Sequence, residues 1–233
     1  MAAIQQTGIQ VSIYLLAGVA TTLSAFNECG RKLDRMFRAD GLEPIIHVIF
    51  PYGDHTRSLI RQLLDVRTDL TSWKTASRIG GRYALNQIKR TYGGQPLLLI
   101  GHSGGGVAAY QAGRMLYEEG MTNNFRIVQV GSPRVRIAPE LQNRVCYFHC
   151  VDSRGKVKDP ISRIGSWGGW SSEHGKMPYW NRYKYAPGYV SGIPVIGGHA
   201  DYFRHLNPYI DGQSICNLDK TIDRVRRWLK GSV

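Results

Sequence analysis

The run Gly101-His102-Ser103-Gly104-Gly105 places a serine among small residues, a pattern that can expose a reactive hydroxyl. Four apolar residues, Leu97-Leu-Leu-Ile100, predict a strand that leads directly into the run, and Val107-Ala-Ala-Tyr predicts the start of a helix after it. A serine on a sharp strand-to-helix turn presents its Oγ for nucleophilic attack, and glycines on either side let the turn pass close to neighbouring backbone. The run lacks the Gly-Lys-Ser/Thr ending of a phosphate-binding loop. We therefore interpret Ser103 as a nucleophile rather than as part of an ordinary glycine-rich turn.

Three short motifs resemble those of one known family. They are Gly-His-Ser-Gly-Gly-Gly at 101–106, Val-Gly-Ser-Pro-Arg-Val at 130–135 and Gly-His-Ala-Asp-Tyr-Phe at 198–203. Together they are similar to the α/β-hydrolase superfamily, and most similar to its class 3 (fungal-type) lipase-like branch. The resemblance extends from Trp73 to Phe203. One position departs from the pattern, because Gly104 stands where this branch commonly has Leu.

An activated serine needs a base within hydrogen-bond reach and an acid that orients the base. In the fold that the resemblance implies, both partners follow the nucleophile, near the ends of later strands. His199 comes after the last predicted strand and after Gly197-Gly198, so we interpret it as the base. A capping or core histidine is the alternative for this position. Of the remaining histidines, His47 and His149 lie in predicted strands, and His55 precedes the nucleophile. His102 is the variable residue of the serine turn, His174 lies in an aromatic segment, and His205 lies in a predicted following helix.

Two aspartates are candidates for the acid. Asp159 lies in Lys158-Asp-Pro-Ile-Ser-Arg-Ile164, which resembles the family's Asp followed by apolar or Pro positions and then Arg. Asp152 ends the predicted strand 145–151, and the family usually places the acid soon after that strand. We favour Asp159, with Asp152 as a capping or turn residue, and keep Asp152 as the alternative. Asp201 is too close to His199 in sequence to reach it easily in the required orientation.

An oxyanion hole requires two backbone N–H groups aimed at the developing charge. Gly104, directly after the nucleophile, is expected to supply one, and the turn Gly18-Val19 after the first strand is expected to supply the other. Resemblance to the His-Gly-x turn of lipases points to Val19, although Ala17 stands where His is usual. An ordinary strand-ending turn is the alternative. No His/Cys/Asp cluster has metal-ligand spacing and no dinucleotide fingerprint is present, so neither a metal nor a cofactor is predicted.

The elements that must position these residues alternate between strand and helix. Apolar runs predict strands, and amphipathic patterns predict helices. Such an order predicts an α/β fold with a mostly parallel sheet and helices on both faces, and 233 residues suit a single domain over 1–233. The predicted strands are 9–16, 44–50, 97–100, 126–130, 145–151 and 194–196, and the predicted helices are 29–39, 56–66, 73–92, 107–119 and 217–230.

The segment 164–194 is rich in Trp and Tyr and shows no clear period. A long aperiodic loop in a compact domain is usually functional, so we predict a lid or substrate loop here. Trp167, Trp170 and Trp180 are the predicted substrate contacts. Trp and Tyr beside Lys and Arg also suit a lipid interface. A loop packed down as ordinary core is the alternative.

Net charge and cysteine content restrict which partners and which cellular compartment the sequence predicts. The net charge of +13 favours acidic partners, among them an anionic membrane to which the protein could attach weakly, and a soluble surface that is basic without such a role is the alternative. Binding of nucleic acid is not expected, because basic residues are scattered and no nucleic-acid motif accompanies them. The four cysteines fit no disulfide framework, the start carries no secretory signal, and no apolar run is long enough to span a bilayer. These features predict a cytoplasmic protein with reduced thiols.

The resemblance implies a serine hydrolase that cleaves a carboxylic ester, of a small molecule or a lipid, through an acyl-enzyme. Ser103, Asp159 and His199 would carry the reaction. Thioesterase or amidase chemistry on the same three residues remains open. A member of the fold that binds without catalysing is the third possibility, and it requires that these residues fail to converge.

Overall fold

Six parallel strands form the central sheet of the computed structural model, which describes residues 8–18, 26–52, 79–172 and 177–231. Each strand pairs in parallel with its neighbours. The predicted α/β fold with a parallel sheet is therefore confirmed. Across the sheet the order is β2 (Leu42–Ile49), β1 (Ile9–Leu16), β3 (Leu97–His102), β4 (Phe125–Val130), β5 (Val145–Cys150) and β8 (Tyr189–Ile193).

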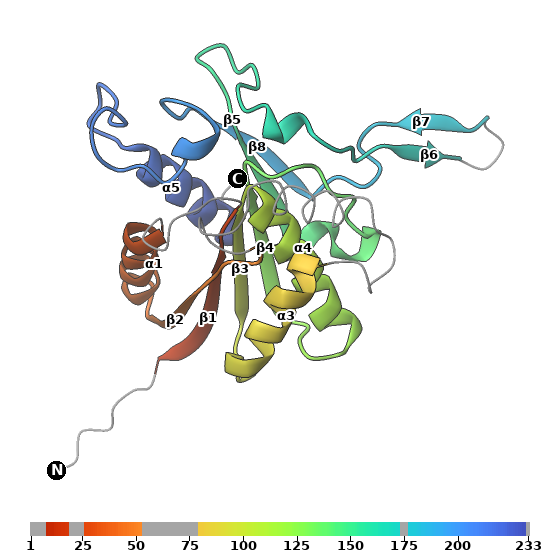
Figure 1. The fold of residues 1–233 in the computed structure, drawn as a ribbon, viewed down its shortest axis with the longest axis horizontal. Helices are drawn as coiled ribbons and strands as arrows, with labels where there is room; N and C mark the ends of the chain where they lie inside the picture. The colour runs from red at the N-terminus through yellow and green to blue at the C-terminus, as the bar shows by residue number, and fades with distance from the viewer. Residues whose placement is uncertain (1–7, 19–25, 53–78, 173–176, 232–233) are drawn as a thin grey trace.

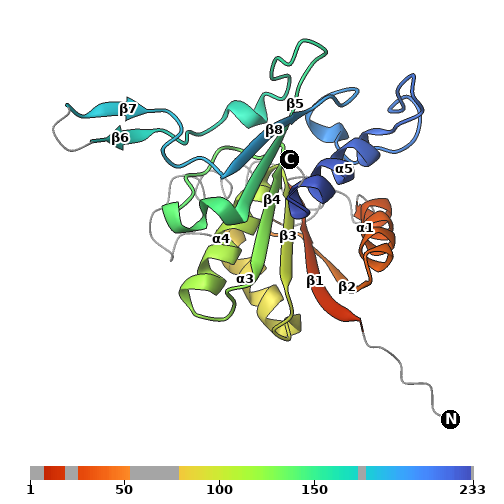
Figure 2. The ribbon, with the colours of Figure 1, turned by 180° about the vertical axis from the view of Figure 1, so that it is seen from behind.

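Helices cover both faces of this sheet (Figures 1 and 2). On one face lie α1 (Asn27–Ala39) and α5 (Asn217–Leu229), and on the other lie α3 (Ile79–Thr91) and α4 (Gly104–Glu118). Two apolar clusters result, one on each side of the strands. A strand with helices on both sides must be apolar throughout. The run Leu97-Leu-Leu-Ile100 meets this requirement, and all four side chains are buried.

The predicted boundaries hold to within a few residues for the elements that fall in described parts of the chain. The largest shift is at α4, which begins at Gly104 rather than at Val107 because the glycines after Ser103 already belong to its first turn. The predicted helix 56–66 and the first residues of the predicted helix 73–92 lie outside the described residues. All four cysteines are buried free thiols.

The predictions for the region after β5 were partly wrong. Residues 194–196 form no strand, and the last strand of the sheet is β8, at Tyr189–Ile193. The segment 164–194, predicted to be a loop, also contains β6 (Gly169–Ser171) and β7 (Tyr179–Asn181), which pair antiparallel. Strands of three residues are too short to show an alternating pattern. His205 lies in a turn region rather than in a helix.

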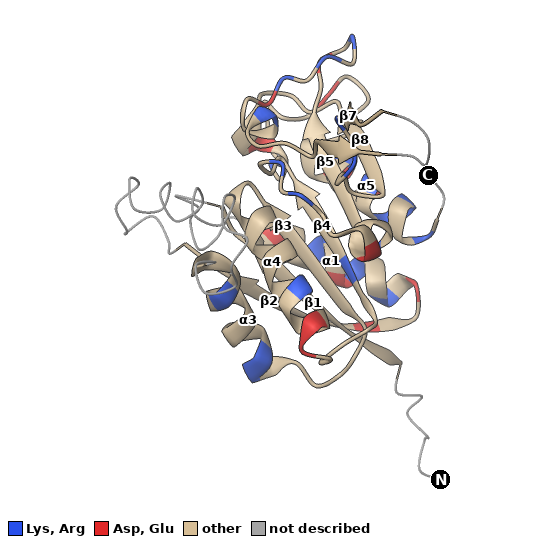
Figure 3. Ribbon diagram, turned by 90° about the vertical axis from the view of Figure 1, so that its right-hand side faces the viewer, with Lys and Arg blue, Asp and Glu red and all other residues tan. Residues whose placement is uncertain are grey.

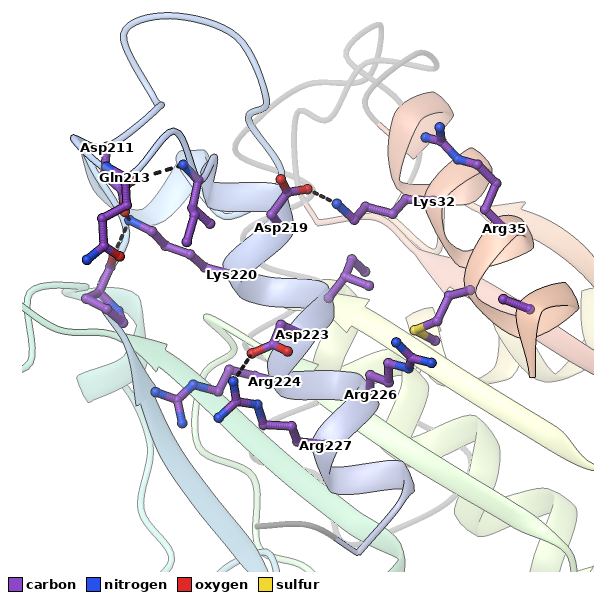
Figure 4. A pocket seen from close by; sticks show the side chains of 15 residues that line it. Lys32, Arg35, Asp211, Gln213, Asp219, Lys220, Asp223, Arg224, Arg226 and Arg227 are labelled. Carbon is purple, nitrogen blue, oxygen red and sulfur yellow. Dashed lines mark hydrogen bonds and ion pairs between the residues drawn. The ribbon is translucent and has the colours of Figure 1, made fainter.

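Charged residues are spread over many elements of the described chain (Figure 3). Between α1 and α5 lies an open hollow of about 960 Å³, lined by basic and acidic side chains (Figure 4). Three ion pairs join residues of its lining to one another: Lys32 with Asp219, Lys220 with Asp211 (2.8 Å) and Arg227 with Asp223 (3.0 Å). No helix in the described part of the chain is long and apolar enough to span a bilayer.

Candidate active site

Ser103 occupies the turn between β3 and α4. Its backbone has φ 56° and ψ −131°, a conformation that costs a non-glycine residue about 1–3 kcal/mol. The neighbouring strand holds the turn in place, because the Ser103 N–H donates to the Val130 carbonyl (3.0 Å). The side chain is therefore presented by a strained turn that the surrounding backbone fixes.

Close packing around this turn explains the glycines of the motif. A Cβ on Gly101 would collide with the Gly105 carbonyl, and one on Gly105 would collide with the Leu16 carbonyl. A Cβ on Gly18 would lie 2.6 Å from the Cβ of Ser103. Only glycine fits at these positions, so β1, β3 and the start of α4 can meet directly beneath the serine.

A chain of hydrogen bonds links the three side chains that the sequence analysis selected. His199 Nε2 lies 2.9 Å from Ser103 Oγ. On the other side of the ring, His199 Nδ1 lies 3.0 Å from both oxygens of Asp159. These distances match those between a nucleophile, its base and the orienting acid. Ser103 follows β3, Asp159 lies in the segment after β5, and His199 lies in the segment after β8. The three residues therefore meet at the carboxyl ends of the parallel strands.

Asp159 is fully buried and heavily hydrogen-bonded. Besides His199, it accepts a hydrogen bond from the Tyr202 hydroxyl (2.8 Å) and one from the Ile161 N–H (2.9 Å). Burial alone would raise the pKa of this carboxyl group, but the hydrogen bonds and the positive charge that His199 can carry hold its pKa below the ordinary value. Asp159 is thus an ionised acceptor for the Nδ1–H of His199.

The other two aspartates have different partners. Asp152 accepts hydrogen bonds from the N–H groups of Arg154 and Lys156 (2.9 Å each), which makes it a turn residue. Asp201 accepts a hydrogen bond from the Gly198 N–H (2.9 Å) and so closes the turn that carries His199. The structure brings Asp159, and neither of these two, to the histidine.

The first turns of α5 fix the loop of His199. Asn217, which is fully buried, donates to the carbonyls of Ile196 (2.7 Å) and Asp201 (3.0 Å), and it accepts from the Ile196 N–H (2.8 Å). Thr221 donates to the Tyr202 carbonyl (2.9 Å). The side chains of α5 therefore fix the backbone on both sides of His199.

His102, which the sequence analysis set aside as the variable residue of the elbow, is part of the site. Its Nε2 donates to the His199 carbonyl (2.9 Å), and the two rings stack with centroids 5.1 Å apart. Burial, reinforced by the nearby His199, lowers the pKa of His102 to about 4, so its ring is neutral near pH 7. His102 thereby ties the backbone of His199 to the strand that leads into Ser103. Its place directly before Ser103 was the available signal.

Tyr202 and Gly131 form a second set of contacts that holds Asp159 in place, and the sequence analysis missed both residues. The fully buried Tyr202 hydroxyl donates to Asp159 and accepts from the Cys150 N–H (2.5 Å). A Cβ on Gly131 would lie 2.6 Å from the Tyr202 ring and 2.8 Å from an oxygen of Asp159. The single glycine of the run 130–135 thus leaves room for this contact. Both residues stand in motifs that carried the resemblance, which was the signal.

Of the two predicted oxyanion donors, only Gly104 lies in a described part of the chain. Gly104 is the first residue of α4, where N–H groups have no acceptor within the helix. Val19 lies outside the described residues, although the preceding Gly18 packs against Ser103. The start of a helix also carries partial positive charge, which suits an anion beside the serine.

The three tryptophans predicted to contact substrate have different surroundings. Trp167 is buried and packs edge-on against Tyr147, with ring centroids 4.9 Å apart. Trp170 and Trp180 face each other across the β6–β7 pair and are more than half exposed. Contact between these residues and a substrate stays a prediction.

Acid should destabilise the wild-type protein through His102. The ordinary pKa of 6.5 applies in the unfolded chain, and the folded value is about 4. The unfolded chain therefore binds more protons between these values, and stability falls as pH drops through this window. We expect the free energy of unfolding to fall by about 2 kcal/mol more for wild type than for His102→Asn between pH 7 and about pH 4.5.

Urea unfolding at the two pH values measures this difference, since Asn does not titrate and can still donate to the His199 carbonyl. Equal losses for the two proteins would show that His102 is not held neutral by the fold.

No protein-family model and no curated protein matches the sequence. Solved structures do match the fold. The NocB thioesterase domain from the nocardicin cluster is 14% identical, with a TM-score of 0.53, over 95% of this chain and 94% of that chain. ClbQ from the colibactin NRPS/PKS pathway is 12% identical, with a TM-score of 0.51, over 96% and 98% of the two chains. A dienelactone hydrolase-like promiscuous phosphotriesterase from metagenomic libraries is 12% identical, with a TM-score of 0.53, over 97% and 88%. The chain has the α/β-hydrolase fold, as predicted.

Proposed function

We propose that this protein is a serine hydrolase that cleaves carboxylic esters through an acyl-enzyme. The observation that carries the proposal is the unbroken hydrogen-bond chain from Ser103 Oγ through His199 to the buried Asp159. Ser103 is the nucleophile, His199 the general base and Asp159 the group that fixes the tautomer of the imidazole. Ser103 directly precedes α4, and the N-terminus of this helix supplies the electrostatic part of the mechanism.

The first half of the reaction acylates the enzyme. As Ser103 Oγ attacks the ester carbonyl carbon, its proton moves to His199 Nε2, and the carbonyl oxygen becomes an oxyanion. The N–H groups of Gly104 and Val19 stabilise this oxyanion. When the tetrahedral intermediate collapses, the bond to the leaving alkoxide breaks, and the alkoxide takes the proton from His199. Asp159 stays ionised and stabilises the imidazolium throughout.

In the second half, water replaces the leaving group. His199 takes a proton from the water, the hydroxide adds to the acyl carbon, and collapse returns the proton to Ser103 as the free acid leaves. All bonds made to the serine are therefore broken again, and no cofactor is consumed.

We place the chain in the class 3 (fungal-type) lipase-like branch, supported by the room that Gly131 leaves for Tyr202 beside Asp159.

Thioester hydrolysis is the second candidate function. The likeness to the NocB thioesterase domain and to ClbQ concerns the fold, but the same serine could attack a thioester by the same steps. Phenyl butyrate and S-phenyl thiobutyrate share their acyl group and differ in the leaving atom. The ratio of their kcat/KM values therefore compares the two activities directly.

We expect turnover of phenyl butyrate, measured as phenol release, and a kcat/KM at least equal to that for the thioester. A preference for the thioester above about tenfold, or about 1.4 kcal/mol of transition-state binding, would assign the protein to thioester hydrolysis instead. Turnover of neither, by a protein shown to be folded, would favour a binding role for the fold.

A further inference from the structure

A small antiparallel sheet projects from the body of the molecule (Figures 1 and 2). It consists of β6 and β7, in which Trp170 pairs with Trp180, and it is separate from the six-stranded sheet. We call the described residues 169–172 and 177–184 the aromatic hairpin. A two-stranded sheet is only marginally stable in water on its own, so contacts outside the two strands must stabilise it.

The aromatic hairpin exposes an unusual amount of apolar surface. Its large apolar side chains are exposed to between about two fifths and nine tenths: Trp170 (65%), Met177 (87%), Tyr179 (43%), Trp180 (51%) and Tyr183 (54%). The two tryptophan rings contact each other edge to face, with centroids 5.8 Å apart. A gathered apolar surface of this kind marks an interaction site, whereas single exposed apolar residues do not.

The base of the aromatic hairpin is fixed to the body. Trp167 is buried against Tyr147, and the Arg134 guanidinium lies 4.9 Å from the centre of its ring. Tyr185 closes the other side, because its N–H donates to the Trp167 carbonyl (2.9 Å) and its own carbonyl accepts from the Ile137 N–H (2.9 Å). The hairpin is thus held at its base while its aromatic surface stays in solvent.

The charge around these aromatic residues is positive. Arg182 donates to the Tyr183 hydroxyl (2.7 Å) and lies over its ring, and Lys184 binds the Trp170 carbonyl. In sequence, the segment 164–194 carries Lys176 in addition to these two cations and only Glu173 against them, in a chain of net charge +13. The surface therefore complements a negatively charged partner.

We propose that the aromatic hairpin docks on the surface of an anionic lipid bilayer. Trp and Tyr combine an apolar ring with a polar tip and concentrate at the bilayer interface, while Met can enter the acyl region. Arg182 and Lys184 face the negative potential of anionic headgroups, which attracts basic residues close to the surface. A protein partner would favour a shaped, apolar patch without neighbouring cations such as Arg182 and Lys184. The surface contains none of Ser103, Asp159 and His199, so binding to vesicles can be measured separately from ester cleavage.

Co-sedimentation with vesicles tests the proposal. The probes are vesicles of phosphatidylcholine alone and vesicles that also hold about 30 mol % phosphatidylglycerol. We expect wild type to bind the anionic vesicles and to bind the neutral ones much more weakly. Trp170→Ser combined with Trp180→Ser should lower the partition coefficient by about tenfold or more, because both interfacial rings are lost.

A second variant and a matched control keep the result interpretable. Arg182→Gln combined with Lys184→Gln keeps the rings and should remove most of the preference for anionic vesicles. Ile9→Ser removes a similarly exposed apolar side chain (67%) at the start of β1 and should bind like wild type. Hydrolysis of a water-soluble short-chain ester should be retained in the Arg182→Gln and Lys184→Gln double variant and in Ile9→Ser, because these replacements leave the Ser103 site and the predicted substrate contacts unchanged.

Three outcomes would overturn the proposal. The first is no binding of wild type to anionic vesicles. The second is unchanged binding in both double variants, whose folding is checked by thermal unfolding. The third is a concentration-dependent dimer, seen by sedimentation velocity without vesicles and abolished by the tryptophan replacements, which would assign the surface to a second copy of this chain.

Discussion

Replacing Ser103 with Ala is expected to lower kcat for phenyl butyrate by about 10⁶-fold, as for other enzymes in which a serine, a histidine and an aspartate act as a unit. The variant keeps the strand, the turn and the histidine, and loses only the Oγ that lies 2.9 Å from His199 Nε2. Residual hydrolysis would come from binding and from the oxyanion donors. Ala is also small enough for the close packing of Gly18 against this side chain.

Initial rates at saturating substrate measure this loss, with protein purified twice to exclude contaminating esterases. Ser153→Ala is the matched control, because this exposed serine lies beside Asp152 and outside the hydrogen-bond chain, and its activity should equal that of wild type. A Ser103→Ala variant that retains a tenth of wild-type kcat would place the chemistry on another residue.

Replacing Asp159 with Asn should lower kcat by about 10⁴-fold while leaving the fold intact. Asn has the same shape, and its one carbonyl oxygen can keep one of the two hydrogen bonds that Asp159 accepts on separate oxygens, from Tyr202 and from the Ile161 N–H. Its amide, however, is a donor toward His199 Nδ1. The imidazole then carries its proton on Nε2 and can no longer accept one from Ser103, so the serine is not activated.

The measurement is kcat together with the thermal unfolding midpoint, which separates loss of tautomer control from loss of fold. Asp152→Asn is the control, since Asp152 accepts hydrogen bonds from turn N–H groups and does not reach His199. Its activity should stay within about twofold of wild type. The reverse ranking of these two variants would show that Asp152 acts as the acid.

The sheet and the strained turn that carries Ser103 could be predicted from the sequence because local signals fix them. Leu97-Leu-Leu-Ile100 must be buried on both faces, and the glycines that follow mark a turn that no larger residue could form. His199 could be selected because it follows the last strand of the sheet by only a few residues. In each case the signal lies within a few residues of the feature that it predicts.

Other features depend on contacts between distant segments and leave little local trace. The choice between Asp159 and Asp152 depends on which carboxylate meets a histidine about 40 residues later, and spacing does not decide this. His102 acts on the backbone of His199, 97 residues away. The strands β6 and β7 are each three residues long, too short for any periodicity.

Covalent labelling tests most directly whether Ser103 is the nucleophile. The folded protein is treated with a fluorophosphonate, digested, and its modified peptide sequenced by mass spectrometry. We predict a single adduct, located on Ser103, with labelling abolished in Ser103→Ala and strongly slowed in Asp159→Asn, where the serine is not activated. An adduct on a different residue, or undiminished labelling of Ser103→Ala, would contradict the assignment.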